Sequence, residues 1–414
     1  MPCHFLVASW GSPGHLGPTL TAAGQLRRRG HGVRFIARAD ARADVEAAGY
    51  QFATWQRGPD FTPVAPNGTP LQQAYDQLLF GPAAARAADT KDEIDRAPTD
   101  AVLTDTGLVG SAVAAEAAGI PCALLSPTIS LRPLPGVPAL QSGLLPPRDG
   151  EAGAEVAAAN EQFAAAMNAC LPMLNAARQN FGLAPFRHVL ELFDRPARHL
   201  LAVSAAFDYP AHALPSNLRY VGPLLESYDW TKPWQPPWPQ QSKRPRALVS
   251  FSTTDQNQTE ALQRTVNALA LAGIDGVATV GPALDPAKLQ APDNVALLPS
   301  APHDAVMQEV SVVVTHGGHG TVSRALWRGL PLLVMPMGRD QDDIAARVAF
   351  HGAGLVLPST APATEIAAAL TRLVREPPFR AAARRLGDAI AEEIAATRLV
   401  DEMEAIVEAR AISS

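Results

Sequence analysis

Short apolar runs that alternate with helix-like stretches recur along the chain in two separate series. The runs lie at 4–9, 32–37, 100–105 and 121–126 in the first series, and at 246–252, 275–280, 294–299, 311–316 and 330–336 in the second. Between the first two runs, Leu16, Leu20, Ala23 and Leu26 recur at helical spacing. Because strands that alternate with helices indicate a parallel, doubly wound sheet, each series predicts one Rossmann-like α/β domain.

A segment rich in proline and tryptophan separates the two series. Residues 228–246 include prolines that cannot lie inside regular elements, so we expect a linker here. Its tryptophans, Trp230, Trp234 and Trp238, are expected to pin the linker to a domain surface rather than to stack on a ligand. The predicted organisation is a domain at 1–227, the linker at 228–246, a domain at 247–395 and a C-terminal helix at 396–414 that packs back on the N-terminal domain.

Composition excludes several classes of protein. The net charge of −6 offers no basic surface for a nucleic acid, and no run of about 18 apolar residues could span a membrane. Cys3, Cys122 and Cys170 lack metal-binding spacing and indicate a reducing compartment. The N-terminus lacks the basic leader and apolar core of a signal peptide. We therefore expect a cytoplasmic monomer or homodimer whose partners are small molecules.

A glycine-rich motif, His-Gly-Gly-His-Gly-Thr, follows the run at 311–316 and precedes a helix-like stretch. His316 is expected at the carboxyl end of a strand, where doubly wound sheets bind ligands. The glycines let the backbone approach a ligand closely, and Thr321 lies in a first helical turn, whose unpaired N–H groups favour an anion. We expect a phosphate or diphosphate here. The alternative is a tight turn with a structural histidine.

The block at 315–357 resembles the donor-binding signature of nucleotide-sugar-dependent glycosyltransferases with the GT-B fold. More narrowly, it resembles the family of plant secondary-metabolite glycosyltransferases and bacterial macrolide and antibiotic glycosyltransferases. The match comprises His-Gly-Gly-x-Gly-Thr, Gly329-x-Pro331, the pair Asp340-Gln341 and Gly352-x-Gly354. The layout is similar along essentially the whole chain, although the N-terminal half matches only at short motifs. The resemblance implies two Rossmann-like domains that face each other across a cleft, with the acceptor in the N-terminal domain and the nucleotide sugar in the C-terminal domain.

The resemblance also implies roles for individual residues of the donor site. The diphosphate would be held by His316 and the neighbouring amides, the sugar hydroxyls by an acid–amide pair, and the nucleobase by a backbone segment that lacks the tryptophan of plant members. The candidate donor-binding residues are Ser252, Thr253, Ser300, Ala301, His316, Gly318, Gly320, Thr321, Arg324, Asp340 and Gln341.

Two of these residues have alternative interpretations. Asp340 precedes an acidic helical turn and could serve as a helix cap instead, although capping and sugar binding are compatible. Arg324 stands where plant-type relatives carry a glutamate that accepts hydrogen bonds from both ribose hydroxyls. Because arginine only donates, we expect dTDP-sugars to be accepted at least as well as UDP-sugars. The alternative is that Arg324 meets water or an acidic neighbour.

A second glycine-rich segment, at 11–18, follows the first apolar run. Its glycines stand at Gly-x-x-Gly-x-x-Gly spacing and Arg38 ends the second run, which together argue against a dinucleotide site. The family places its catalytic base in this turn, and His15 occupies the matching position. Histidine suits the task, because an acceptor hydroxyl must lose a proton as it attacks.

An acidic partner for this histidine is expected at Asp105, which ends the run at 100–105 and matches the family's partner position. Asp100 begins that run and should lie at the opposite edge of the sheet. His4 and His31 are explained as residues at a strand start and a helix end.

Acceptor recognition is less constrained by the sequence. The segments at 53–70 and 131–147 are long and proline-rich, and aromatic residues near the cleft could line an apolar pocket or belong to the core. The candidates are Trp10, Trp55, Phe61 and Phe80. The resemblance implies an aromatic or polyketide-like acceptor.

The sequence thus predicts an inverting, metal-independent hexosyltransferase that uses a UDP- or dTDP-sugar and a small lipophilic acceptor. No resident cofactor is expected, because helix N-termini and His316 can neutralise the leaving diphosphate and no Asp-x-Asp motif occurs in the expected cleft strands. One alternative is a sugar-nucleotide epimerase of the same fold, which would need no acceptor pocket. Another is a non-catalytic partner subunit that binds a sugar nucleotide, against which His15 and Asp105 argue.

Overall fold

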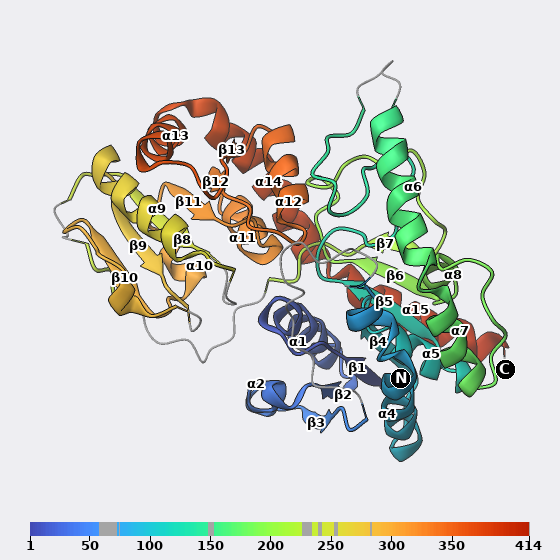
Figure 1. The fold of residues 1–414 in the computed structure, drawn as a ribbon. Coiled ribbons are helices and arrows are strands. Elements are labelled where there is room, and N and C mark those ends of the chain that lie inside the picture. The colour runs from blue at the N-terminus through green and yellow to red at the C-terminus, as the bar shows by residue number, and fades with distance from the viewer. Residues whose placement is uncertain are drawn as a thin grey trace.

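The computed structural model describes residues 1–57, 73, 75–147, 153–225, 234–238, 242–251, 256–281 and 284–413. Two α/β domains lie side by side, each built on one parallel sheet with helices on both faces (Figure 1). Both sheets are doubly wound, so the predicted fold class is confirmed. Within the described ranges, every helix is too short or too polar to cross a lipid bilayer.

The N-terminal sheet has the strand order β3-β2-β1-β4-β5-β6-β7. Its strands are β1 His4–Ala8, β2 Gly32–Ala37, β3 Gln51–Thr54, β4 Ala101–Asp105, β5 Cys122–Ser126, β6 Arg198–Leu201 and β7 Leu218–Tyr220. Its helices are α1 Pro13–Arg28, η1 Ala39–Ala41, α2 Arg42–Ala47, the π-helical η2 Asp76–Phe80, α4 Ala83–Arg96, α5 Val109–Ala117, α6 Ala154–Asn168, α7 Leu171–Asn180 and α8 Glu191–Asp194.

The C-terminal sheet has the strand order β10-β9-β8-β11-β12-β13. Its strands are β8 Arg246–Ser250, β9 Asp275–Thr279, β10 Val295–Leu298, β11 Val312–Thr315, β12 Leu332–Val334 and β13 Gly354–Val356. The helices that follow β8 are α9 Thr259–Ala272, η3 Pro286–Lys288, α10 His303–Val306, α11 His319–Trp327, α12 Gln341–Phe350, α13 Ala363–Arg375, α14 Pro377–Ala396 and α15 Arg398–Ser413.

The apolar runs form the inner strands because helices cover both faces of each sheet. In β1, Leu6 and Ala8 face one core layer, whereas Phe5 and Val7 face the other. All four are completely buried. This two-sided burial explains why the runs are continuously apolar rather than alternating.

The glycine-rich segment after β1 is mostly helical rather than an open turn. Helix α1 begins at Pro13, and a proline suits the first turn because its missing N–H would have no partner there. Only Gly11 has a positive φ, +75°. His15 therefore lies in the first turn of α1 instead of in a loop.

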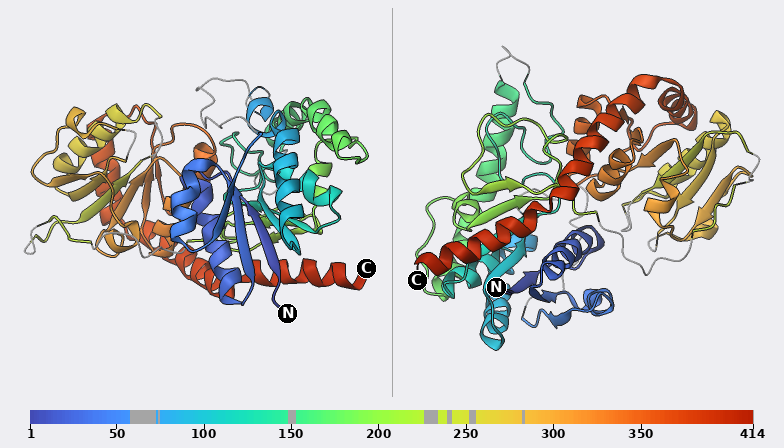
Figure 2. Two further views of the ribbon diagram at one scale, coloured as in Figure 1. Left: turned by 90° about the horizontal axis from the view of Figure 1, so that it is seen from below. Right: turned by 180° about the vertical axis from the view of Figure 1, so that it is seen from behind.

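Helix α15 extends from the C-terminal domain across the N-terminal sheet (Figure 2). Between α14 and α15, Thr397 has a φ of 47°, which redirects the chain. Leu399 and Met403 are buried in the N-terminal core, and Arg29 pairs with Asp401 at 2.6 Å. His31 also binds this helix, through Glu404 at 2.9 Å.

The linker tryptophans that the structure describes hold the chain to the C-terminal domain. Trp234 Nε1 and Trp238 Nε1 donate to the two carboxylate oxygens of Glu309, at 2.8 Å and 3.2 Å. Trp238 is buried in a hydrophobic cluster that contains residues of both domains. The predicted pinning is thus confirmed for these two residues, whereas Trp230 lies outside the described residues.

Candidate active site

His15 and Asp105 meet at the carboxyl edge of the N-terminal sheet. Strand β1 pairs with β4, so the start of α1 lies beside the end of β4. His15 Nδ1 lies 3.2 Å from Asp105 Oδ1. The other oxygen, Oδ2, accepts the backbone N–H of Trp10 at 2.8 Å and the Ser9 hydroxyl at 3.3 Å. These bonds orient the buried carboxylate toward the imidazole.

The electrostatics of this pair suit a proton acceptor. Burial lowers the pKa of His15, but the charge of Asp105 and its hydrogen bond outweigh burial, so the pKa lies above the ordinary 6.5. The imidazole still has 37% of its side-chain surface exposed, whereas Asp105 has none. When Nδ1–H donates to Asp105, Nε2 carries the lone pair and is the atom that can take a proton from a bound hydroxyl.

Asp340, from the opposite domain, faces the same region. Its Oδ2 accepts a hydrogen bond from the Thr128 hydroxyl at 2.8 Å, and its charge contributes to the raised pKa of His15. Asp340 occupies the N-cap position of α12, but its side chain makes no capping hydrogen bond. The capping alternative therefore does not account for this carboxylate, which contacts the N-terminal domain instead.

Gln341 follows Asp340 but is held inside the C-terminal domain. Its Oε1 accepts the backbone N–H of Met337 at 2.8 Å, and its Nε2 donates to Gln256 at 3.0 Å. The side chain is buried. A sugar hydroxyl would therefore have to share or replace these hydrogen bonds at Gln341.

The glycine motif after β11 forms a tight turn. Gly317 has a φ of +100°, and a Cβ there would lie 3.1 Å from the carbonyl oxygen of Gln341. A Cβ on Gly318 would lie 2.9 Å from the imidazole of His316. The amide of Thr321 donates to the carbonyl of Gly318 at 3.0 Å, so the earlier amides of α11 are the better candidates for holding a diphosphate.

His316 lies at the carboxyl end of β11, where the sequence places it. Burial lowers its pKa to about 4, although Asp340 and a backbone hydrogen bond with Ser250 act in the opposite direction. The imidazole is therefore neutral near pH 7 and can offer a ligand one N–H rather than a positive charge.

His319, in the same motif, was given no role by sequence reasoning. It is buried, its Nε2 lies 3.0 Å from the Ser323 hydroxyl, and it makes a hydrogen bond to the backbone of Pro127 in the other domain. Burial lowers the pKa of His319 to about 4. It therefore joins the two domains as a neutral group. Its place in the glycine motif is the one sequence feature that could have indicated this role.

Further contacts between the domains come from one face of α12, and sequence reasoning missed them too. Asp343 accepts the backbone N–H groups of Gln141 at 2.6 Å and Gly143 at 2.9 Å. Arg347 Nε donates to Asp208 at 2.8 Å, and both side chains are buried. Breaking such a pair typically costs about 3–5 kcal/mol because it strands a buried charge. The spacing of Asp340, Asp343 and Arg347 at helical intervals was a signal of a polar face.

Arg324 binds an acidic neighbour within its own domain. Its Nη1 donates to Asp304, at the start of α10, at 2.6 Å. Of the nucleobase candidates just before α10, Ser300 is exposed and Ala301 is half-buried. The alternative that Arg324 meets an acidic neighbour is thus confirmed.

The aromatic acceptor candidates are largely core residues. Phe80 and Trp10 are buried in one core layer of the N-terminal domain, and Trp55 is half-buried against it. Trp10 also lies near the catalytic candidate, with its ring centroid 6.1 Å from that of His15, and the guanidinium of Arg86 stands 4.6 Å over it. Three predicted site residues lie outside the described residues: Phe61, Ser252 and Thr253.

In sequence the chain is similar to enzymes that are named for natural products. Residues 266–406 match the family described as erythromycin biosynthesis protein CIII-like, C-terminal domain. The chain is 28% identical to a 4'-demethylrebeccamycin synthase of Lentzea aerocolonigenes, over 98% of this chain and 100% of that protein. It is 26% identical to UDP-glycosyltransferase 2 of Phaeomoniella chlamydospora, over 92% of this chain and 91% of that protein.

Comparison of structures extends the likeness to the whole architecture. The glycosyltransferase of kitacinnamycin superposes with a TM-score of 0.78 at 23% identity, covering 98% of this chain and 99% of that one. The calicheamicin glycosyltransferase gives a TM-score of 0.77 at 24% identity, covering 98% of both chains. The glycosyltransferase VinC, solved in complex with DTDP, gives 0.71 at 20% identity, covering 98% of this chain and 99% of that one. These likenesses confirm the GT-B fold.

Proposed function

We propose that the chain is a glycosyltransferase and that it transfers a hexose from a UDP- or dTDP-sugar to a small lipophilic acceptor. Its GT-B fold and its similarity to enzymes of antibiotic and natural-product biosynthesis support this proposal. The observation that carries this proposal is the hydrogen bond between His15 and the buried Asp105 at the carboxyl edge of the N-terminal sheet. The pair faces Asp340 of the C-terminal domain, where the resemblance places the sugar.

His15 acts as the general base in this proposal. Its Nε2 takes the proton of the acceptor hydroxyl, while Asp105 holds the ring and stabilises the imidazolium that forms. The oxygen attacks the anomeric carbon from the side opposite the leaving diphosphate. A single displacement of this kind inverts the configuration at that carbon.

The leaving diphosphate is stabilised from the C-terminal domain. The N-terminus of α11 presents amides and the positive end of a helix dipole, and the neutral His316 adds a hydrogen-bond donor. Among the described residues, no group of three His, Cys, Asp or Glu side chains is arranged to hold a metal ion. In the proposed reaction the amides of α11 and His316 stabilise the charge of the leaving group.

A natural-product acceptor and a dTDP-sugar are the finer parts of the proposal. Relatives are named for rebeccamycin, aklavinone and zeaxanthin, which supports a small natural product as acceptor. VinC was solved with DTDP, which supports a thymidine nucleotide. Arg324 in place of a ribose-binding glutamate agrees with this preference.

The test combines a donor, an acceptor panel and analysis of the product. UDP-glucose and dTDP-glucose are incubated with aromatic and polyketide alcohols in the presence of EDTA, and the anomeric configuration of any product is measured by NMR. We expect a β-glucoside from the α-linked donor. Retention of configuration, or a strict need for added metal, would contradict the mechanism. Conversion of the sugar nucleotide without an acceptor would indicate an epimerase, and nucleotide binding without turnover would indicate a partner subunit.

A further inference from the structure

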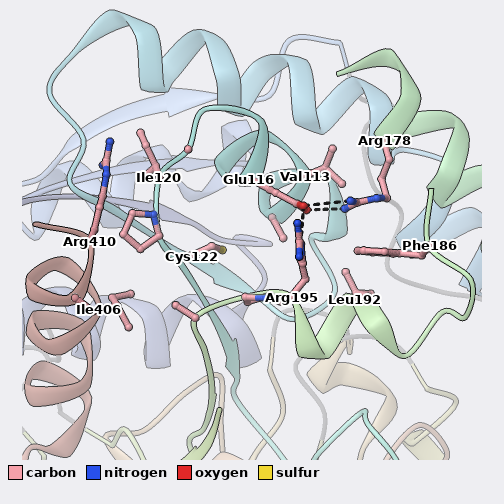
Figure 3. A pocket seen from close by; sticks show the side chains of 16 residues that line it. Val113, Glu116, Ile120, Cys122, Arg178, Phe186, Leu192, Arg195, Ile406 and Arg410 are labelled. Carbon is pink, nitrogen blue, oxygen red and sulfur yellow. Dashed lines mark hydrogen bonds and ion pairs between the residues drawn. The ribbon is translucent and has the colours of Figure 1, made fainter. Parts of the chain in front are cut away.

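A cavity of about 470 Å³ opens on the N-terminal domain. Figure 3 shows the side chains that line it. Its walls come from α5, the segment around α8, and the far end of α15. Cys122 begins β5 and Ala197 precedes β6, so the cavity lies at the amino edge of the sheet. His15 and Asp105 lie at the carboxyl edge. The cavity is therefore separate from the proposed active site.

The interior of the cavity is mainly apolar. Its volume falls in the range of about 300–1,000 Å³ that is typical of small-molecule sites. The apolar lining includes Val113, Ile120, Pro121, Phe186, Leu192 and Ile406. The Cys122 thiol also lines it, and burial raises the pKa of this thiol to about 12, so it adds no charge. This surface suits a hydrocarbon group.

In one wall of the cavity, two arginine guanidinium groups donate hydrogen bonds to a single carboxylate. Glu116 accepts Arg178 Nη1 at 2.6 Å and Nη2 at 3.2 Å, and it accepts Arg195 Nε at 2.7 Å, as the dashed lines of Figure 3 show. The cluster therefore has an excess of one positive charge. Arg178 is buried, with its guanidinium 3.6 Å from the Phe186 ring centroid. The buried Arg178 thus borders the apolar space, whereas Arg195 is exposed to solvent.

Arg195 is the group positioned to meet a ligand. Its Nε is committed to Glu116, and in the described part of the chain both of its Nη atoms are without a protein acceptor. Its side chain is 64% exposed at the mouth of the cavity. An arginine fixed through Nε presents its Nη edge as a fork that matches a carboxylate.

We propose that this cavity binds a small lipophilic carboxylate, with its head group on Arg195 beside Glu116 and Arg178 and its hydrocarbon part against the apolar lining. The positively charged cluster lies beside the apolar interior, and this arrangement complements a ligand with a negative head group and a hydrocarbon tail. Because Ile406 on α15 forms part of the wall, the ligand binds the state in which α15 is docked and stabilises it.

Calorimetric titration of the full-length protein with decanoate, below its micelle concentration, tests the proposal. We expect saturable binding with one ligand per chain, and binding of decan-1-ol that is weaker by about tenfold or more because it lacks the charge. Arg195→Gln should weaken decanoate binding by a similar factor. Arg187→Gln, at an exposed arginine outside the cavity, is the matched control and should bind as the wild type does. Equal affinities for decanoate and decan-1-ol would overturn the carboxylate assignment.

A second pair of variants tests the location. Ala409 is an exposed lining residue on α15, so Ala409→Trp should fill the mouth of the cavity without disturbing the core and should abolish binding. Ala411→Trp places the same side chain on the same helix outside the lining and should leave binding intact. Saturating UDP or dTDP should not compete with decanoate. Wild-type affinity in Ala409→Trp, or competition by a nucleotide, would overturn this site.

Discussion

His15 and His316 both lie at the carboxyl edge of a parallel sheet, and both feel the charge of Asp340, yet their pKa values move in opposite directions. His15 has a buried carboxylate at hydrogen-bond distance, and this partner outweighs burial. Among the described residues no carboxylate lies at hydrogen-bond distance from His316, so burial dominates and lowers its pKa to about 4. A neighbouring carboxylate, rather than position in the fold, decides whether a histidine here is a base or a neutral donor.

This difference divides the chemistry between the two domains. The N-terminal histidine can accept a proton near neutral pH, whereas the C-terminal histidine stays neutral and donates a hydrogen bond. Asp340 acts on the pKa of both histidines and is hydrogen-bonded to the N-terminal domain through Thr128. The comparison predicts that substitutions at the two histidines will differ in how much activity they remove. They should also differ in the pH dependence of that loss and in their effect on nucleotide binding.

The largest effect is expected for His15→Ala. Loss of the general base should reduce kcat on hydroxyl acceptors by about 10²- to 10⁴-fold, while the Kd for UDP and dTDP stays near the wild-type value. Steady-state kinetics and calorimetric titration measure the two quantities. His4→Ala, at an exposed histidine at the amino end of β1, is the control and should leave both unchanged. Wild-type turnover in His15→Ala would show that His15 is not the general base.

A smaller effect, with a distinct pH signature, is expected for Asp105→Asn. In the wild type the raised pKa of His15 means that kcat/KM falls as the pH drops through a midpoint above 6.5, because a protonated imidazole accepts no proton. Asparagine removes the charge that raises this pKa, so the midpoint should move to lower pH while kcat falls about tenfold or more. Asp100→Asn, directly before the amino end of β4, should leave the profile unchanged. An unshifted midpoint in Asp105→Asn would show that Asp105 does not raise the pKa of the catalytic base.

The local features of this comparison could be predicted from the sequence, because they depend on strand ends. Apolar runs place Asp105 and His316 at carboxyl edges, and pairing of β1 with β4 brings Asp105 to His15. The helical start of α1 at Pro13 was missed, because the glycines of that segment indicate a turn.

Contacts between the domains could not be predicted in the same way. The bond between Thr128 and Asp340 depends on how two separately folded sheets face each other, and no periodicity within one sheet encodes that orientation. The same holds for Arg347 and Asp208. Trp10 was equally ambiguous, since a large aromatic residue near a cleft can be core, lining or both.

A more moderate effect is expected for His316→Ala. Loss of one neutral hydrogen bond to the diphosphate should weaken UDP and dTDP binding by about fivefold to tenfold and lower kcat as well. Because the pKa of His316 is about 4, the ratio of wild-type to variant affinity should stay constant between pH 6 and 8. Calorimetry at several pH values measures this ratio, with His188→Ala, at an exposed histidine, as the control. A ratio that rises toward pH 6 would show that His316 acts as a cation and would break the comparison with His15.

The smallest effect concerns Arg324 and the choice of nucleotide. Arginine cannot accept hydrogen bonds from ribose hydroxyls, so the wild type should use dTDP-glucose at least as well as UDP-glucose. The measurement is the ratio of kcat/KM values for the two donors. A strong preference of the wild type for UDP-glucose would contradict the expectation.

The structure changes how this residue should be substituted. Arg324 binds Asp304 at 2.6 Å, so Arg324→Glu alone would set two carboxylates against each other beside the nucleobase segment. The double variant Arg324→Glu with Asp304→Arg keeps an ion pair in place and still supplies a carboxylate for ribose. It should shift the ratio toward UDP-glucose by about fivefold, which corresponds to about 1 kcal/mol for one recovered hydrogen bond. Asp304→Asn alone breaks the ion pair without adding a ribose acceptor, so it should leave the ratio unchanged. If Asp304→Asn shifts the ratio as far as the double variant does, nucleotide choice depends on the position of α10 rather than on the side chain at 324.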